Sequence, residues 1–262
     1  MNIPENAARL LSLEGEVAVV TGAASGIGRG ISIVLAQMGA AVAVLDIDES
    51  GGLATVEEVR KQDGSAIFMR CDVCSSEDCT AAVRKTLESF GKISVLCNNA
   101  GVAIRKTVTE MSEEEWDLTL DVTLKGVYLL SRAVIPHMIR NGGGSIINTG
   151  SGWSLKGGPK AAAYCAAKAG VLNLTRAMAI DYGKDNIRAN CICPGDVDTP
   201  MLRGECAQLG DDPNRFMHDA ANRPLHRVGT PDDVAHAALF LASRMSTWIT
   251  GAALVVDGGG LA

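Results

Sequence analysis

Residues 16–30 read EVAVVTGAASGIGRG, an apolar run followed by a glycine-rich turn and the start of a helical pattern. The apolar run predicts a buried β-strand at 16–21, and the helical pattern continues to Met38. The glycines of the turn are Gly22, Gly26 and Gly28. Glycine permits positive φ and close approach to a ligand, and a helix that starts here can bind a pyrophosphate through its N–H groups. The spacing G-x-x-x-G-x-G differs from G-x-G-x-x-G, so the motif taken alone also fits a simple tight turn.

The rest of the chain repeats this strand-then-helix pattern. Further strands are predicted at 41–46, 66–71, 93–98, 145–150, 187–192 and 252–257. Helices are predicted at about 50–62, 76–90, 112–140 and 158–183. Strands that are apolar throughout and alternate with helices indicate a parallel sheet covered on both faces. The predicted fold class is therefore α/β, a doubly wound Rossmann-type sheet of about seven parallel strands.

No linker or break in composition divides residues 1–262, so we expect a single domain. The least regular region is about 195–230, which is rich in Pro, Gly, Asp and Asn. A connection of this length is typical of a lid or a binding segment, and we expect a mobile substrate-binding loop there.

The composition argues against several classes of protein. The formal net charge is −6 and no run of Lys and Arg occurs, so neither nucleic acid nor an anionic membrane is an expected partner. No apolar run reaches the roughly 20 residues of a membrane helix. The first residues, MNIPENAARLLSLEGE, contain acids and lack the basic and apolar regions of a signal peptide.

The chain has eight cysteines, whose pattern does not favour a metal site or a disulfide framework. The CDVC stretch at 71–74 has neither a second CxxC nor a paired histidine motif. Other cysteines lie in apolar strand-like runs, where Cys acts as a small hydrophobic residue. We expect no metal, and we expect a reducing cytoplasm as the compartment.

Polar residues at the ends of predicted strands are candidates for cofactor binding. Asp46 lies 18 residues after Gly28 (46 − 28). A carboxylate there can accept hydrogen bonds from an adenosine ribose and repels a 2′-phosphate, which favours NAD over NADP. Asp72 could reach an adenine amino group, or it could cap a helix. The NNAG stretch at 98–101 offers partners for a ribose, or it could form a polar turn.

Two further stretches could carry the chemistry. Tyr164 and Lys168 stand four residues apart in AAYCAAK at 162–168, and alanine favours a helix that places them side by side. This spacing alone fits a surface helix as well as a device for proton transfer. Ser151, 13 residues before Tyr164 (164 − 151), adds a hydroxyl that could hold a substrate oxygen.

The chain resembles the short-chain dehydrogenase/reductase family, in its branch of about 250 residues, over nearly its whole length. The resemblance rests on TGAASGIG, NNAG, Ser151, YCAAK, PG at 194–195 and TGAALVVDGG at 250–259, in this order. It implies reversible hydride transfer between NAD(H) and a secondary alcohol or ketone. It also implies that Tyr164 is the acid–base group, that Lys168 lowers the pKa of Tyr164 and binds the nicotinamide ribose, and that Ser151 orients the substrate.

The resemblance also implies a set of cofactor contacts. These would be Gly22, Ser25, Gly26, Ile27, Gly28, Asp46, Ile47, Cys71, Asp72, Val73, Asn99, Ala100, Gly101, Tyr164, Lys168, Pro194, Gly195, Val197 and Thr199. Relatives that use NADP often carry a basic residue where this chain has Ser25, which again favours NAD. Relatives commonly form tetramers through long helices and the last strand, so we expect a homotetramer.

The expected substrate residues are Trp153, Met201 and Leu202, with Phe216 and Met217 as further apolar candidates. Lys156, Lys160, Arg203 and Arg223 could bind an acid group or could be ordinary surface charges. Sugars, polyols, cyclic alcohols, hydroxyacyl thioesters and steroids all remain open as small-molecule substrates.

One position departs from the family pattern. Thr123 stands in LDVTLKG where relatives place an Asn, which helps to hold a water in a proton relay to the active-site lysine. A threonine hydroxyl can still donate and accept a hydrogen bond. Two interpretations stay open, a tolerated variation and a weakened relay, and Thr123 is included among the catalytic candidates.

Three alternatives to an NAD-dependent alcohol dehydrogenase are considered. The first is an NADP-dependent reductase of 3-oxoacyl thioesters. The second is a regulator that binds the cofactor without catalysis, which the departure at Thr123 invites. The third is another chemistry on this scaffold, such as dehalogenation or epimerisation.

Overall fold

A computed structural model describes residues 9–262. These residues form a sheet of seven strands, all parallel, in the order β3-β2-β1-β4-β5-β6-β7. The strands are β1 (Val17–Thr21), β2 (Ala41–Asp46), β3 (Ala66–Arg70), β4 (Val95–Asn98), β5 (Gly144–Thr149), β6 (Ile187–Pro194) and β7 (Ala253–Val256). The predicted doubly wound Rossmann-type sheet is confirmed. The N-terminal stretch that was compared with a signal peptide includes residues 1–8, which lie outside the described residues.

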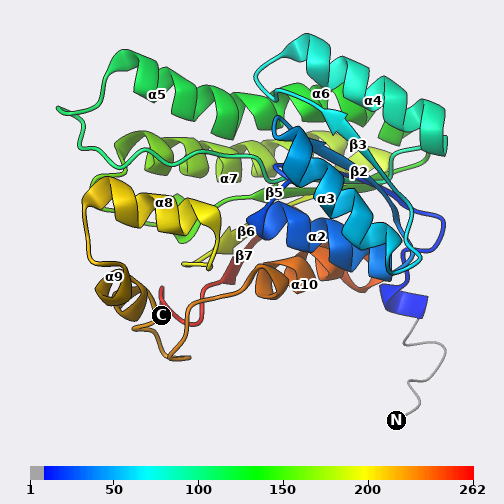
Figure 1. The fold of residues 1–262 in the computed structure, drawn as a ribbon. Coiled ribbons are helices and arrows are strands. Elements are labelled where there is room, and N and C mark those ends of the chain that lie inside the picture. The colour runs from blue at the N-terminus through cyan, green and yellow to red at the C-terminus, as the bar shows by residue number, and fades with distance from the viewer. Residues whose placement is uncertain (1–8) are drawn as a thin grey trace.

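Helices cover both faces of the sheet (Figure 1). One face carries α2 (Gly26–Gln37), α3 (Glu49–Arg60) and α10 (Pro231–Ala242). The other carries α4 (Ser76–Phe90), α6 (Gly126–Arg140) and α7 (Ala162–Tyr182), with α5 (Glu113–Leu120) alongside α7. Within residues 9–262, no helix has the length and apolar character needed to span a bilayer.

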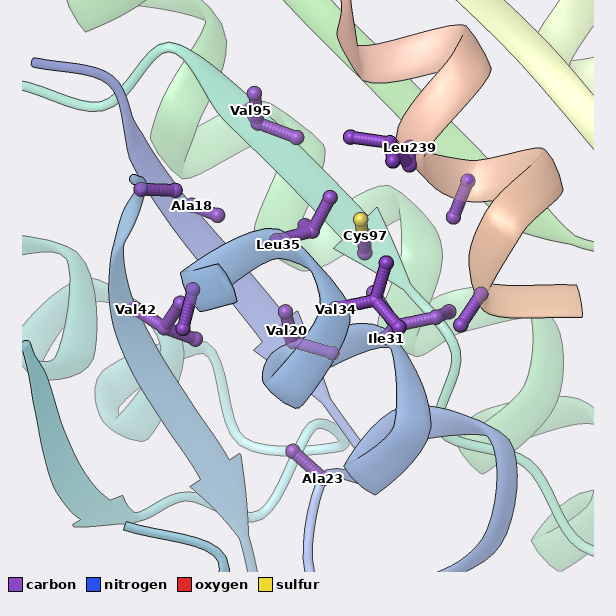
Figure 2. Close-up of a cluster of buried hydrophobic side chains, with 14 of the residues drawn as sticks. Ala18, Val20, Ala23, Ile31, Val34, Leu35, Val42, Val95, Cys97 and Leu239 are labelled. Atoms are coloured by element: carbon purple, nitrogen blue, oxygen red, sulfur yellow. The ribbon is translucent and has the colours of Figure 1, made fainter. Parts of the chain in front are cut away.

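The two faces of the sheet bury separate cores, as alternation along a single strand demonstrates. Val42 and Val44 of β2 point into the core under α2 and α10, while Ala43 and Leu45 point into the other core. Figure 2 shows the first core, where residues of α2 pack against the strands and against Leu239 of α10. This double burial explains why the strands read as continuous apolar runs.

The cysteines are free thiols, and six of them are buried. Cys97 lies in the first core beside Leu35 and Ile31 (Figure 2), as predicted for a cysteine in an apolar strand. Within residues 9–262, no group of three or more His, Cys, Asp or Glu side chains could hold a metal ion.

The helix predicted at 112–140 is interrupted. It consists of α5, a π-helical turn at Asp121–Lys125, and α6. A π-helical turn widens the helix by one residue, and such turns often occur at functional sites. Thr123, the residue that departs from the family pattern, lies on this turn and is fully buried.

The region at 195–230 is more regular than predicted, because it contains α8 (Pro200–Leu209) and α9 (Pro213–Ala220). Thr199 and Asp212 cap these helices with their side chains, and a proline occupies the first helical position of each. The Pro and Asp residues that indicated a loop are therefore helix start signals. Helix α10 was not predicted either, although Thr230 and Asp233 form a capping box at its start.

Candidate active site

A cavity of about 650 Å³ opens where the carboxyl ends of the strands meet. In open α/β sheets this is the edge at which ligands bind. With two exceptions, every residue predicted for the cofactor, the chemistry or the substrate lines this cavity. The exceptions are Gly28 and Thr123, which lie behind the cavity wall, and the further candidates Phe216 and Met217 lie on α9 outside the lining.

The three glycines of the first turn serve two different purposes. Gly22 and Gly26 adopt positive φ values of +61° and +51°, which side chains larger than hydrogen rarely allow. Gly28 is required for packing, because a Cβ there would lie 2.1 Å from the Gly22 carbonyl oxygen. The turn is therefore held tightly against the start of α2, and its backbone faces the cavity.

The start of α2 differs from the starts of most other helices. In the structure of residues 9–262, the side chain of the N-cap residue Ser25 accepts no hydrogen bond from the N–H groups of the first turn of α2. That turn also has no acidic residue. Side chains do cap α3, α4, α5, α8, α9 and α10. Ser25, Gly26 and Ile27 all line the cavity, so the uncapped N–H groups there suit an anion such as the pyrophosphate of a nicotinamide dinucleotide.

Asp46 is held firmly at the end of β2. Its Oδ2 accepts a hydrogen bond from the Ala24 N–H at 2.9 Å, and its Oδ1 accepts one from the Asp48 N–H at 3.0 Å. A carboxylate has about four acceptor positions, so capacity remains for two ribose hydroxyls. The residues present therefore fit the adenosine end of a dinucleotide.

The polar residues that follow β3 and β4 have two roles. Some hold the local structure in place, and others line the cavity. Asp72 accepts a hydrogen bond from the Cys74 N–H at 2.9 Å, while Ser75 caps α4, so Asp72 is not the helix cap that was the alternative. Asn98 is buried and donates to the Asn148 side chain at 2.8 Å, which makes it structural. Asn99 bonds the backbone of Thr21 at 3.1 Å and also lines the cavity.

Helix α7 places Tyr164 and Lys168 side by side, as their spacing predicted. The Lys168 Nζ lies 5.6 Å from the centroid of the Tyr164 ring and donates to the Thr149 carbonyl at 2.6 Å. The Ser151 side chain accepts from the Trp153 N–H at 3.1 Å and lines the cavity together with Tyr164 and Lys168. The three predicted catalytic residues therefore meet at one wall of the cavity.

The expected lowering of the Tyr164 pKa by Lys168 is not what the chain itself produces. Burial raises the pKa of Tyr164 above its ordinary value, the charge of Glu205 raises it further, and the Ser151 hydrogen bond opposes both. Burial also lowers the pKa of Lys168 to about 8. Loss of water around both groups disfavours the phenolate as well as the ammonium, and this loss cannot be inferred from their spacing.

Thr123 lies behind Lys168 and outside the cavity lining. Its Oγ1 accepts from the Val102 N–H at 3.2 Å. A Cβ on Gly101 would lie 3.5 Å from both the Thr123 Oγ1 and the Lys168 Nζ, so the two groups flank the same glycine. The hydroxyl occupies the region expected for a relay residue, and its role in proton transfer stays a prediction.

Sequence reasoning missed a cluster at the substrate end of the cavity. Arg105 Nη1 donates to Glu205 Oε2 at 2.6 Å, and the Arg105 guanidinium carbon lies 4.9 Å from the Trp153 ring centroid. Trp153 in turn meets Tyr164 edge to face, with centroids 5.9 Å apart. No local spacing could have revealed this cluster, because Arg105 and Glu205 are 100 residues apart.

Comparisons with known proteins agree with this geometry. A family model described as enoyl-(acyl carrier protein) reductase matches residues 22–260. The chain is 40% identical over 248 residues to the 3-oxoacyl-[acyl-carrier-protein] reductase FabG of Chlamydia muridarum, covering 94% of this chain and 98% of that protein. It is 37% identical over 249 residues to the 2-(S)-hydroxypropyl-CoM dehydrogenase 3 of Xanthobacter autotrophicus, covering 94% of this chain and 97% of that protein.

A solved structure of 7α-hydroxysteroid dehydrogenase, complexed with NADH and 7-oxo glycochenodeoxycholic acid, is similar with a TM-score of 0.90 and 33% identity over 97% of each chain. The similarity to these proteins extends over almost the whole chain, and the range matched by the family model, 22–260, spans the residues that meet at the cavity. The chain therefore belongs to the short-chain dehydrogenase/reductase family, and it is an oxidoreductase of the kind that binds a nicotinamide cofactor and acts on small molecules.

Proposed function

We propose that this protein catalyses reversible hydride transfer between NAD(H) and a secondary alcohol or the corresponding ketone. The observation that carries the proposal is the meeting of Ser151, Tyr164 and Lys168 at one cavity wall, beside the glycine turn and the uncapped start of α2. The cofactor supplies the hydride chemistry when it is bound.

The chain's own residues would position the substrate oxygen and move its proton. The Ser151 hydroxyl lines the same cavity as Tyr164 and can hold that oxygen beside the phenol. Tyr164 takes the hydroxyl proton during oxidation and returns it during reduction. Lys168, anchored on the Thr149 carbonyl, places its amine beside the Tyr164 ring, where its charged form favours the phenolate.

Three features support NAD rather than NADP. Asp46 presents a fixed carboxylate to the cavity, where it would accept ribose hydroxyls and repel a 2′-phosphate. Ser25 occupies the position at which NADP-dependent relatives often carry a basic residue. One similar protein of known structure binds NADH. The nicotinamide carboxamide would lie against Val197 and Thr199, both of which line the cavity.

A second candidate function is the reduction of 3-oxoacyl thioesters. The specific observation in its favour is the 40% identity to a 3-oxoacyl-[acyl-carrier-protein] reductase. The same three catalytic residues would serve it, since the substrate carbonyl is reduced to a secondary alcohol in both cases. Asp46 argues against the NADP-dependent form of this alternative.

Absorbance at the nicotinamide band tests the proposal with a panel of secondary alcohols, ketones and a 3-oxoacyl thioester, for the wild type and Tyr164→Phe. Phe keeps the ring and removes the proton-transferring hydroxyl, so we expect kcat to fall by about 10²–10⁴-fold while cofactor affinity is retained. Equal turnover by the two proteins would remove Tyr164 from the mechanism. Turnover confined to the thioester would select the second candidate, and NAD(H) binding without turnover would select the regulator.

We further propose that residues 1–262 form a single domain that assembles as a homotetramer in the cytoplasm, as relatives commonly do. Two large apolar side chains of helix α7 and the segment before β7, Ile180 and Trp248, are almost fully exposed in the single chain, which supports burial between copies. Light scattering that reports a monomer would contradict the tetramer, and two separate unfolding transitions would contradict the single domain.

A further inference from the structure

The substrate end of the cavity combines apolar walls with one carboxylate. Trp153, Met201 and Leu202 supply apolar surface, and Glu205 of α8 lines the same space. The Glu205 side chain is 11% exposed, which is low for a charged group. A carboxylate among apolar walls needs a compensating partner, and in a cavity a bound ligand can supply a hydrogen-bond donor to it.

Arg105 compensates Glu205 from behind the cavity wall and cannot itself bind a substrate. Its Nη1 donates to Glu205, its Nη2 to the Pro159 carbonyl at 2.9 Å, and its Nε to the Lys160 carbonyl at 3.3 Å. The guanidinium is also stacked on Trp153, and the side chain is only 7% exposed. Arg105 is absent from the cavity lining formed by residues 9–262. It is therefore a positioning residue for Glu205.

Glu205 keeps acceptor capacity that faces the cavity. The bond to Arg105 engages Oε2 alone, whereas a carboxylate offers about four acceptor positions on two oxygens. Glu205 lines the same cavity as Ser151 and Tyr164, and its charge raises the pKa of Tyr164. One substrate can therefore contact Glu205 and the catalytic residues at the same time.

Three other charged side chains near this end have partners in the chain. Asp196 is paired with Arg223, which also donates to the Ala220 carbonyl at 2.7 Å. Lys156 reaches the Gly260 carbonyl at 3.4 Å. A further one, Asp257, accepts from the Gly259 N–H at 2.8 Å through Oδ1, while its Oδ2 is buried and has no hydrogen-bond partner among the described residues. Glu205 differs from Asp196 because its partner Arg105 lies outside the cavity lining, whereas the Asp196 partner Arg223 lines the cavity itself.

We propose that Glu205 determines specificity by accepting a hydrogen bond from a second polar group of the substrate, separate from the reacting carbinol. The inference rests on the proposed function and narrows its substrate class to secondary alcohols that carry a further hydroxyl or ammonium group. A site built around a hydrogen bond discriminates against an analogue without the donor, because the buried acceptor then stays unpaired. A carboxylate in the place of that donor would be repelled by Glu205.

One matched series of probes tests this proposal. Cyclohexanol and its derivatives with hydroxyl, ammonium or carboxylate at position 2, 3 or 4 share the ring and the reacting carbinol, and the position that gives the strongest preference is used for the comparison of variants. For the wild type we expect kcat/KM to be at least about tenfold higher with the hydroxyl and ammonium compounds than with cyclohexanol, and lowest with the carboxylate. Both cofactors and both configurations of each compound are included.

Two variants of Glu205 separate charge from hydrogen bonding. Glu205→Gln keeps an acceptor without charge, so the preference for the ammonium compound should fall at least about tenfold, the carboxylate penalty should shrink, and the preference for the diol should persist. Glu205→Leu removes the acceptor, so the preference for the diol should also disappear. Asp198→Asn is the matched control, because Asp198 lies in the same region, pairs with Arg203 at 2.8 Å and is well exposed.

Binding provides a readout that does not depend on turnover. Titration calorimetry measures the dissociation constants of these compounds from the enzyme–NADH complex, and thermal unfolding checks that each variant is folded. The role of Glu205 is overturned if the wild type shows no preference for a hydroxyl or ammonium at any of the three positions. It is also overturned if the affinity of the substituted compound relative to cyclohexanol is the same in the wild type, Glu205→Gln and Glu205→Leu. The proposed function has a separate test, since it fails if Tyr164→Phe turns over its substrates as fast as the wild type, whatever the Glu205 variants show.

Discussion

The two ends of the cavity are built in different ways. The cofactor end is formed mainly by backbone, with Gly22, Gly26 and the uncapped start of α2 presented by one short segment. The substrate end is formed by side chains from distant segments, with Arg105, Trp153 and Glu205 brought together only by folding. A site made of backbone leaves a local signature in the sequence, whereas a site made of converging side chains does not.

The largest effect is expected from breaking the ion pair at the substrate end. Arg105→Met leaves Glu205 buried without its compensating charge, so the free energy of unfolding should fall by about 3–5 kcal/mol. Denaturant unfolding at neutral pH measures the change. Arg203→Met breaks the exposed pair with Asp198 and should cost less than about 1 kcal/mol. Similar losses in the two variants would mean that burial of the Arg105 pair has no special importance.

The next effect concerns the backbone of the cofactor end. In Gly28→Ala the added Cβ would lie 2.1 Å from the Gly22 carbonyl oxygen, so the turn must open. We expect the dissociation constant for the cofactor to rise at least about hundredfold, near 2.8 kcal/mol, in a fluorescence titration. Gly204→Ala is the control, because a Cβ there meets nothing within 4 Å and the residue lies outside the cavity lining. Unchanged affinity in Gly28→Ala would show that the turn tolerates opening.

A smaller effect tests Asp46, the carboxylate at the end of β2. The wild type should prefer NAD over NADP by at least about tenfold in kcat/KM, or about 1.4 kcal/mol, and Asp46→Ser should remove this preference. Asp63→Asn, an exposed turn residue with φ of 60° that Asn also accepts, should leave the ratio unchanged. Equal use of both cofactors by the wild type would contradict the proposal that Asp46 selects NAD over NADP.

The smallest effect is expected behind the catalytic wall. Thr123 already bonds the Val102 backbone and lies beside Gly101, so Thr123→Asn should change turnover by less than about tenfold, or 1.4 kcal/mol. Steady-state kinetics of the variant provide the measurement. A gain of several hundredfold would instead favour the weakened relay, and would place the limitation in proton transfer rather than at either end of the cavity.

The sheet was predictable because every strand is buried on both faces and therefore reads as an apolar run. The helices of the substrate region were not, because Pro200 and Pro213 look like loop residues until their capping partners Thr199 and Asp212 are recognised. The π-helical turn at Asp121–Lys125 was also hidden, since one added residue barely disturbs the helical pattern.

The candidate site was predictable where its residues are close in the sequence. Tyr164 and Lys168 follow the helical repeat, and the glycines follow a strand, so local geometry implied their positions. The raised pKa of Tyr164 was not predictable, because it depends on how deeply α7 is buried and on the charge of Glu205. Trp153 lines the cavity and its contact with a substrate stays a prediction, while its stacking on Arg105 emerged only from the structure.

The sequence by itself determined the parallel α/β architecture, the backbone of the cofactor end and the pairing of Tyr164 with Lys168. Each of these depends on spacing within one strand, one turn or one helix. Only the tertiary structure decided the loss of water around the catalytic pair and the convergence of Arg105, Trp153 and Glu205. The physical reason is that burial and electrostatic contact depend on distance in space, and residues 100 positions apart acquire that distance only when the sheet and its helices assemble.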